Sequence, residues 1–173
     1  AFNLGGNNSD AANAVAVDDQ DRIVVVGEVE RAATGDFDFG TARLTTTGAL
    51  DTSFNGSGKR VTHFDLAASM RFDNARAVAI DSAGRISIAG GAYDAARSVT
   101  RIALARLTDA GLADTSFCPD SCNYMDSYTA INNGRRVIFY GSATPALSDQ
   151  VAAMAINRRV MLAHAPSEGR EVV

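Results

Sequence analysis

An internal repeat constrains the fold of this chain more than any other feature of its sequence. Four landmarks recur at the single offset that relates Ala14 to Ala77, without a gap, and chance does not readily produce such agreement. The paired segments are 13–18 with 76–81, 22–27 with 85–90, 41–45 with 104–108, and the tetrapeptide Asp-Thr-Ser-Phe at 51–54 and 114–117. The chain of 173 residues is therefore built from repeated structural units.

A degenerate third copy is predicted after the second Asp-Thr-Ser-Phe. Residues 136–141 resemble residues 85–90, and Phe2-Asn3-Leu4 resembles Phe64-Asp65-Leu66 at the other end. This alignment predicts the end of a preceding repeat (1–12), a first repeat (13–63), a second repeat (64–123), a degenerate third repeat (124–165) and a polar tail (166–173).

The residues within each copy predict β-structure. Short runs rich in Val and Ile are bounded by Asp, Asn and Gly, which is typical of strands and turns and gives about four strands per copy. Residues 14–17 and 23–26 are apolar on both faces, so their sheets have to be covered on both sides. We therefore expect an all-β fold, a β-propeller-like stack of about three four-stranded antiparallel blades. A closed propeller has about four to eight blades, so this one is expected to be incomplete. A flat β-sandwich is the alternative.

These motifs resemble a known repeat family. The second copy reads Ala-Val-Ala-Ile-Asp at 77–81, Gly-Arg-Ile-Ser-Ile-Ala-Gly at 84–90, Ala-Leu-Ala-Arg-Leu at 103–107 and Asp-Thr-Ser-Phe at 114–117. This pattern, which covers residues 2–117 well, resembles the delta-60 repeat of bacterial secreted proteins. The resemblance implies a β-propeller-like fold and a location in the periplasm, on the cell surface or outside a bacterium. It implies no catalytic residue.

Polar residues that recur once per copy are interpreted as framework. An arginine lies inside the same apolar strand of each copy, and a buried arginine needs a carboxylate partner. The aspartate of Asp-Thr-Ser-Phe is the natural partner, and the phenylalanine is expected to fill the space between blades. The predicted framework residues are Arg43, Arg106, Asp51, Asp114, Phe54 and Phe117. A ring of arginines that binds a ligand in a central channel is the alternative.

Two clusters are weighed as candidate sites. The turn with Asp18, Asp19 and Asp21 offers carboxylates to Ca²⁺, although aspartate is also an ordinary turn residue. No other cofactor is expected. Cys118 and Cys122 are separated by three residues that include a proline, so they are predicted to form a disulfide, which would indicate export. Free thiols and metal or redox chemistry are the alternatives.

Charge and hydropathy limit the partners. The formal charge of −4 argues against nucleic acid, and no apolar run approaches the roughly 20 residues that a membrane-spanning helix requires. An end blade with an uncovered apolar face is expected to associate with another copy or with a partner protein, and a glycan is a further candidate ligand. We expect a non-catalytic binding or assembly module of an exported bacterial protein. The alternatives are a structural subunit of a larger complex and part of a propeller enzyme whose site other blades complete.

Overall fold

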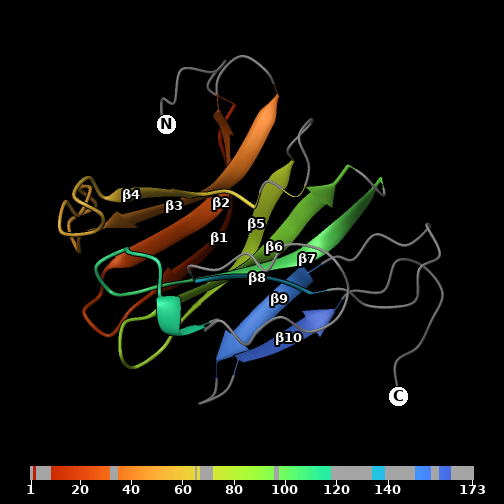
Figure 1. The fold of residues 1–173 in the computed structure, drawn as a ribbon. Coiled ribbons are helices and arrows are strands. Elements are labelled where there is room, and N and C mark those ends of the chain that lie inside the picture. Colours follow the sequence, from red (N-terminus) through yellow and green to blue (C-terminus); the bar gives the residue numbers. More distant parts are fainter. Residues whose placement is uncertain are drawn as a thin grey trace.

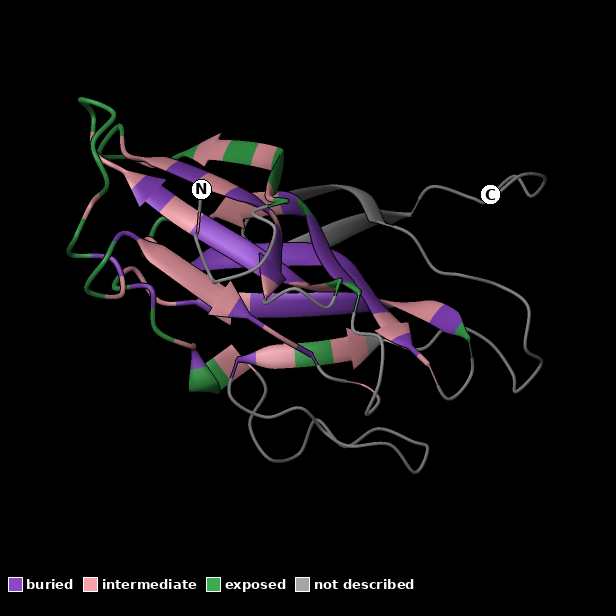
Figure 2. Cartoon of the chain, turned by 90° about the horizontal axis from the view of Figure 1, so that it is seen from above, coloured by how far each residue is buried: buried purple, intermediate pink, exposed green. Residues whose placement is uncertain are grey.

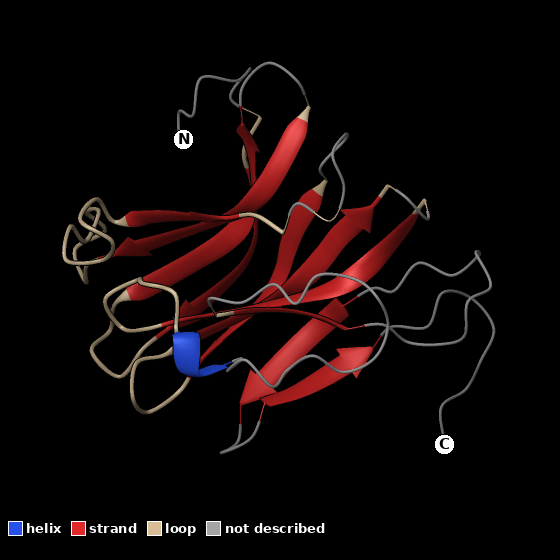
Figure 3. Cartoon of the chain, in the orientation of Figure 1, coloured by secondary structure: helices blue, strands red, loops and turns tan. Residues whose placement is uncertain are grey.

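Over the residues that it describes, the computed structural model of the chain is all-β apart from one short 3-10 helix. It describes residues 2, 9–31, 35–64, 66, 72–95, 98–117 and 134–138, together with the backbone of 151–156 and 160–164. The strands are β1 (Ala11–Val17), β2 (Ile23–Arg31), β3 (Asp36–Leu44), β4 (Lys59–Thr62), β5 (Asp73–Ile80), β6 (Ile86–Asp94), β7 (Val99–Leu107), β8 (Arg135–Ile138), β9 (Val151–Ile156) and β10 (Val160–His164). The 3-10 helix spans Thr115–Phe117 (Figure 3).

The strands form two four-stranded antiparallel sheets and a hairpin. The first sheet has the order β1-β2-β3-β4, the second has the order β5-β6-β7-β8, and β9 pairs with β10 (Figure 1). Strands β6 and β7 begin and end at the positions that the repeat offset assigns to β2 and β3, so the sequence repeat is also the structural repeat. The predicted all-β fold with four-stranded antiparallel units is confirmed. The third four-stranded unit stays a prediction, because the described residues after β8 form a two-stranded sheet.

The last strand of the second sheet departs from the predicted alignment. The sequence places residues 136–138 in a third repeat, whereas β8 pairs with β7. Its counterpart is β4, since Gly58-Lys59-Arg60-Val61 resembles Gly134-Arg135-Arg136-Val137. Gly58 follows the first Asp-Thr-Ser-Phe closely, whereas Gly134 stands well beyond the second, so the second copy has a longer connection before its outer strand. The residue pattern of a strand as short as β8 does not specify its partner. The longer connection also changes the offset between β4 and β8, so the repeat alignment did not reveal that these two strands are equivalent.

The two sheets pack face to face, each through a different face. Because side chains alternate across a strand, each sheet has two faces, which we call the leading face and the trailing face. The leading face of the first sheet carries Val15, Val17, Ile23, Val25, Ala42 and Leu44, and the equivalent positions of the second sheet are Val78, Ile80, Ile86, Ile88, Ala105 and Leu107. The trailing face of the first sheet, with Val24, Val26 and Phe39, packs against the leading face of the second in one buried core. Strand β9 lies against β5 and β6.

Candidate functional site

The strand arginine and the Asp-Thr-Ser-Phe segment form one corner of the first sheet. Arg43 is 1% exposed, and its Nε lies 2.8 Å from Oδ2 of Asp51. Its Nη2 donates a hydrogen bond of 3.1 Å to Oγ of Ser53, and its guanidinium lies over the ring of Phe54, 4.9 Å from the ring centroid. One buried cation is thus held by a carboxylate, a hydroxyl and an aromatic face.

The second sheet repeats this corner. Arg106 Nε lies 2.7 Å from Oδ2 of Asp114, its Nη2 donates to Oγ of Ser116 at 3.2 Å, and its guanidinium lies 4.7 Å from the ring centroid of Phe117. The structure therefore brings together all six predicted framework residues in two equivalent groups. The same four residue types recur as a unit once per copy, which is the pattern of a framework.

The tetrapeptide adopts its shape because the aspartate binds its own backbone. Oδ1 of Asp51 accepts hydrogen bonds from the N–H of Ser53 at 3.0 Å and from its hydroxyl at 2.6 Å, which makes an Asx turn. Asp114 accepts the same two bonds from Ser116, at 3.0 and 2.6 Å. The spacing Asp-x-Ser is therefore a structural requirement of the turn.

These bonds stabilise the ionised carboxylates. The hydroxyl of Ser53 holds the pKa of Asp51 below its ordinary value, against the opposing effect of burial, and Arg43 lowers it further. Burial works to raise the pKa of Asp114, but the hydrogen bonds from Ser116 and Arg106 outweigh it and lower the pKa. Both corners are therefore stable in the charged form at neutral pH.

Acid is expected to weaken both corners. Because the pKa of each carboxyl is lower in the folded chain than in the unfolded chain, its contribution is complete above the unfolded value of about 4 and is lost as the pH falls through the folded value. Thermal unfolding between pH 7 and pH 2 should show the melting temperature falling below about pH 4. Asp51→Asn and Asp114→Asn should flatten this fall, whereas Asp19→Asn, at an exposed turn position, should leave its slope unchanged.

The corner of the first sheet docks on a turn of the second. Nη1 of Arg43 donates to the carbonyl of Asp109 at 2.5 Å and to its Oδ1 at 3.0 Å, and the N–H of Asn55 donates to the carbonyl of Ala110 at 2.8 Å. Phe54 lies against Gly111, where a Cβ would come within 2.7 Å of the ring. Gly111 also has a φ of +75°, so glycine is required there both by the aromatic ring and by the backbone.

The equivalent turn of the first sheet is open. Gly48 takes the place of Gly111 in the first copy and has a φ of +84°, the same left-handed conformation. Among the described residues, no atom lies within 4 Å of the position that its Cβ would take. The turn is built like the one that receives Phe54, and it faces outward.

The leading face of the first sheet is open as well. Val15 and Val17 are 63% and 60% exposed, whereas their equivalents in the second sheet, Val78 and Ile80, are half-buried. Ile23 and Val25 are half-buried, whereas their equivalents, Ile86 and Ile88, are buried. In Figure 2 the interior strands are largely buried, and an outer strand alternates between exposed and intermediate residues. At each of these positions the apolar side chain is therefore more exposed in the first copy than in the second.

Phe2 repeats in the first copy a contact that Phe64 makes in the second. Its N–H donates to Oδ2 of Asp10 at 2.6 Å, as the N–H of Phe64 donates to Oδ2 of Asp73 at 2.7 Å. Phe64 lies between the two sheets with its ring centroid 5.0 Å from that of Phe39. Phe2 therefore occupies in the first copy the place that Phe64 occupies in the second.

Sequence reasoning missed an ion pair that recurs in both copies and includes a buried aspartate. Arg31 Nε lies 3.7 Å from Oδ2 of Asp38 in the first sheet, and Arg101 Nε lies 3.8 Å from Oδ2 of Asp94 in the second. Positions 31 and 94 are equivalent, as are 38 and 101, so the two copies carry the same ion pair with the charges exchanged. The sequence signal for these ion pairs was a charge of opposite sign at each of the two equivalent positions, 31 with 94 and 38 with 101.

The aspartate turn has a structural role in both copies. Asp18 accepts hydrogen bonds from the N–H groups of Gln20 and Arg22 and from Nε of Arg22, and Asp81 accepts the same set from Ala83 and Arg85. Within the described residues, no three side chains of the metal-binding types are placed to hold an ion. The calcium prediction for Asp18, Asp19 and Asp21 thus gains no support from their geometry. The predicted disulfide of Cys118 and Cys122 lies outside the described residues.

Four-stranded sheets that repeat along the chain and stack face to face define a β-propeller-like repeat protein. A family model described as a domain of unknown function (DUF5122) beta-propeller matches residues 21–54 and 84–117. Each match spans the two inner strands and the Asp-Thr-Ser-Phe corner of one copy, and the two matches are related by the repeat offset. They support a β-propeller-like repeat family. No curated protein matches the sequence at a significant level. In the part of the chain that the structure describes, no helix is long and apolar enough to span a membrane.

Proposed function

We propose that this chain is a non-catalytic assembly module of an exported bacterial protein, with repeats of the delta-60 type. The leading face of its first sheet receives a further blade of the same repeat, supplied by a second copy of the chain. The equivalence of the two leading faces carries this proposal. In the second sheet this face is covered by the trailing face of the first, and in the first sheet the same face is open.

The existing interface shows what the incoming blade must provide. Its trailing face has to cover Val15, Val17 and the residues beside them, and its corner has to place a phenylalanine against Gly48, as Phe54 lies against Gly111. Burying each exposed valine contributes about 1.5–3 kcal/mol. A sheet of the same repeat has both the apolar face and the corner, which supports an occupant of the same repeat type.

The oligomeric state tests the proposal. Sedimentation velocity over a range of concentrations should show the 18.1 kDa chain associating as concentration rises. The double variant Val15→Glu/Val17→Glu should sediment as a monomer, because charged side chains on the leading face would be buried without partners. Leu112→Glu is the matched control, since Leu112 is also exposed but lies outside this face, and it should associate like the wild type.

A wild-type chain that remains monomeric at every concentration would contradict the proposal. The same holds if the double valine variant associates as strongly as the wild type. Circular dichroism of each variant checks that the β-structure is retained, which is expected because both valines are already exposed to solvent.

A further inference from the structure

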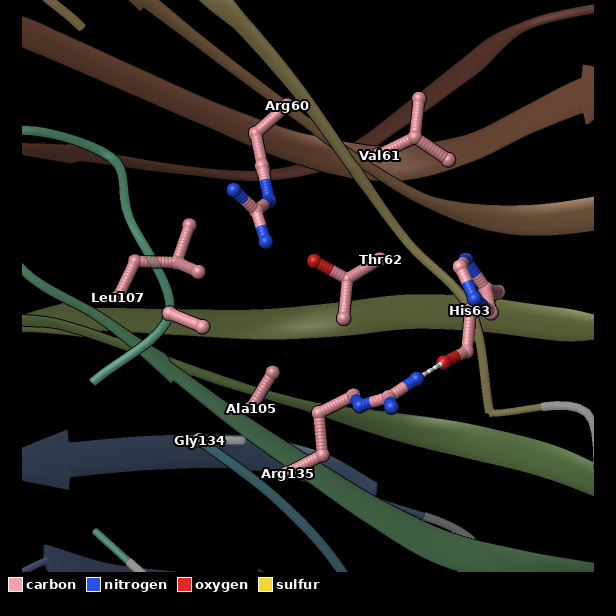
Figure 4. Close-up of a pocket in the computed structure, with 9 residues that line it drawn as sticks. Arg60, Val61, Thr62, His63, Ala105, Leu107, Gly134 and Arg135 are labelled. Atoms are coloured by element: carbon pink, nitrogen blue, oxygen red, sulfur yellow. Dashed lines mark hydrogen bonds between the residues drawn. The ribbon is translucent and has the colours of Figure 1, made fainter. Parts of the chain in front are cut away.

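A cavity with arginine side chains on two sides lies between the sheets. It has a volume of about 150 Å³ and separates β4 of the first sheet from β7 and β8 of the second. Figure 4 shows Arg60 and Thr62 entering it from β4 and Arg135 from β8, with Ala105 and Leu107 among the opposing residues. The guanidinium of Arg135 donates to the carbonyl of His63 at the rim.

Among the described residues, two polar atoms in this region have no hydrogen-bond partner. Thr62 is 6% exposed and its Oγ1 is unpartnered, as is the buried Nε of Arg60. Nη1 of Arg60 reaches the neutral acceptors Asn55 Oδ1 at 3.3 Å and the Gly111 carbonyl at 3.5 Å, and no carboxylate of the described residues pairs with this guanidinium. Buried polar groups in folded proteins nearly always have partners, so a water or ion is the expected explanation.

The repeat shows that the fold does not require hydroxyl groups at this place. Thr62 is equivalent to Ile138 of the second sheet, and Thr41, which pairs with Arg60 in register, is equivalent to Leu104. The Oγ1 of Thr41 is likewise buried without a partner. At two buried positions, then, the first sheet has a hydroxyl where the second sheet has an aliphatic side chain. A feature that one copy lacks is not part of the common framework.

The chemistry of the lining identifies a ligand class. Arg60 Nε is a hydrogen-bond donor, the hydroxyl of Thr62 can donate, and both arginines bring positive charge into a partly enclosed space. Guanidinium groups match the geometry of carboxylate, phosphate and sulfate oxygens. One water takes up about 30 Å³ of liquid volume, so the cavity has room for a small tetrahedral ion. We propose that this cavity binds a small oxoanion, held by Arg60 and Thr62 with Arg135 opposite. The site is independent of the proposed self-association.

Anion-dependent stability tests this site. Thermal unfolding is followed in chloride, sulfate, phosphate and acetate at one ionic strength, for the wild type, Thr62→Val and Arg60→Gln. A bound anion at 100 times its dissociation constant raises the folding equilibrium constant about 100-fold, so the melting temperature of the wild type should rise with the logarithm of anion concentration. This rise should disappear in both variants. Arg136→Gln changes an exposed arginine of β8 and should respond like the wild type.

The decisive readout is the difference in anion response between the wild type and the variants, because sulfate and phosphate also stabilise proteins by exclusion from their surface. Thr62→Val keeps the shape of the side chain and is expected to fold, with a melting temperature in chloride close to that of the wild type. A response to phosphate and sulfate identifies a free tetrahedral anion, and a response to acetate alone identifies a carboxylate. If wild type and Thr62→Val respond equally to every anion, the cavity holds water only and the proposal fails.

Discussion

Replacing Phe54 with alanine is expected to lower the free energy of unfolding by about 3–5 kcal/mol, the usual cost of truncating a buried phenylalanine. The Phe54 side chain is fully buried in the core between the sheets, where it contacts Gly111 and lies under the guanidinium of Arg43. Truncation opens a cavity that this glycine turn cannot fill, because Gly111 has no side chain. Equilibrium unfolding in urea measures the change as a lower midpoint with an unaltered slope.

The repeat provides a matched control for this substitution. Phe117 is the equivalent residue of the second copy but is half-buried, so Phe117→Ala should cost less than Phe54→Ala. Equal losses from the two substitutions would mean that the contact between the sheets adds nothing to the burial of Phe54. The interface would then not be the tight contact described above.

Replacing Asp51 with alanine is expected to cost about 3 kcal/mol, at the lower end of the range for breaking a buried ion pair. The variant leaves Arg43 buried without its nearest carboxylate, although Asp109 still lies 3.0 Å from Nη1. The Asx turn with Ser53 is lost as well. Urea unfolding of Asp51→Ala, Arg43→Met and the double variant forms a cycle that isolates the coupling between the two residues.

The double variant Arg43→Met/Asp51→Ala is expected to be more stable than Asp51→Ala alone, because it no longer buries an uncompensated charge. If the losses in free energy of unfolding were strictly additive in the cycle, Arg43 and Asp51 would act independently, which would contradict their contact of 2.8 Å. The equivalent substitution Asp114→Ala should cost less, since the side chain of Arg106 is more exposed than that of Arg43.

The repeat made much of this fold predictable. One offset aligned the inner strands and their turns, and a polar residue that recurs within an apolar strand needs a polar partner in every copy. This reasoning selected Arg43 with Asp51 and Arg106 with Asp114, the pairs that the structure places at 2.8 and 2.7 Å. Both are local contacts between residues close together in the chain, so a sequence pattern is sufficient to suggest them.

Features that depend on how the two sheets meet were not predictable in this way. The short strand β8 fits several partners by pattern, and the longer connection before it changed the offset that had located the other strands. Thr62 looks like any strand threonine until the second sheet is placed across from it. The cavity that it borders arises from the packing of residues from distant parts of the chain.

The contact between Phe54 and Gly111 joins two different surfaces, and this has a consequence for symmetry. Copies that associate in the same manner are related head to tail, and no two-fold axis can generate such a pair. A contact of this kind closes into a ring when the rotation from one copy to the next divides a full turn, and otherwise it grows into an open fibre. The angle between neighbouring sheets, rather than the strength of their packing, therefore determines whether growth stops.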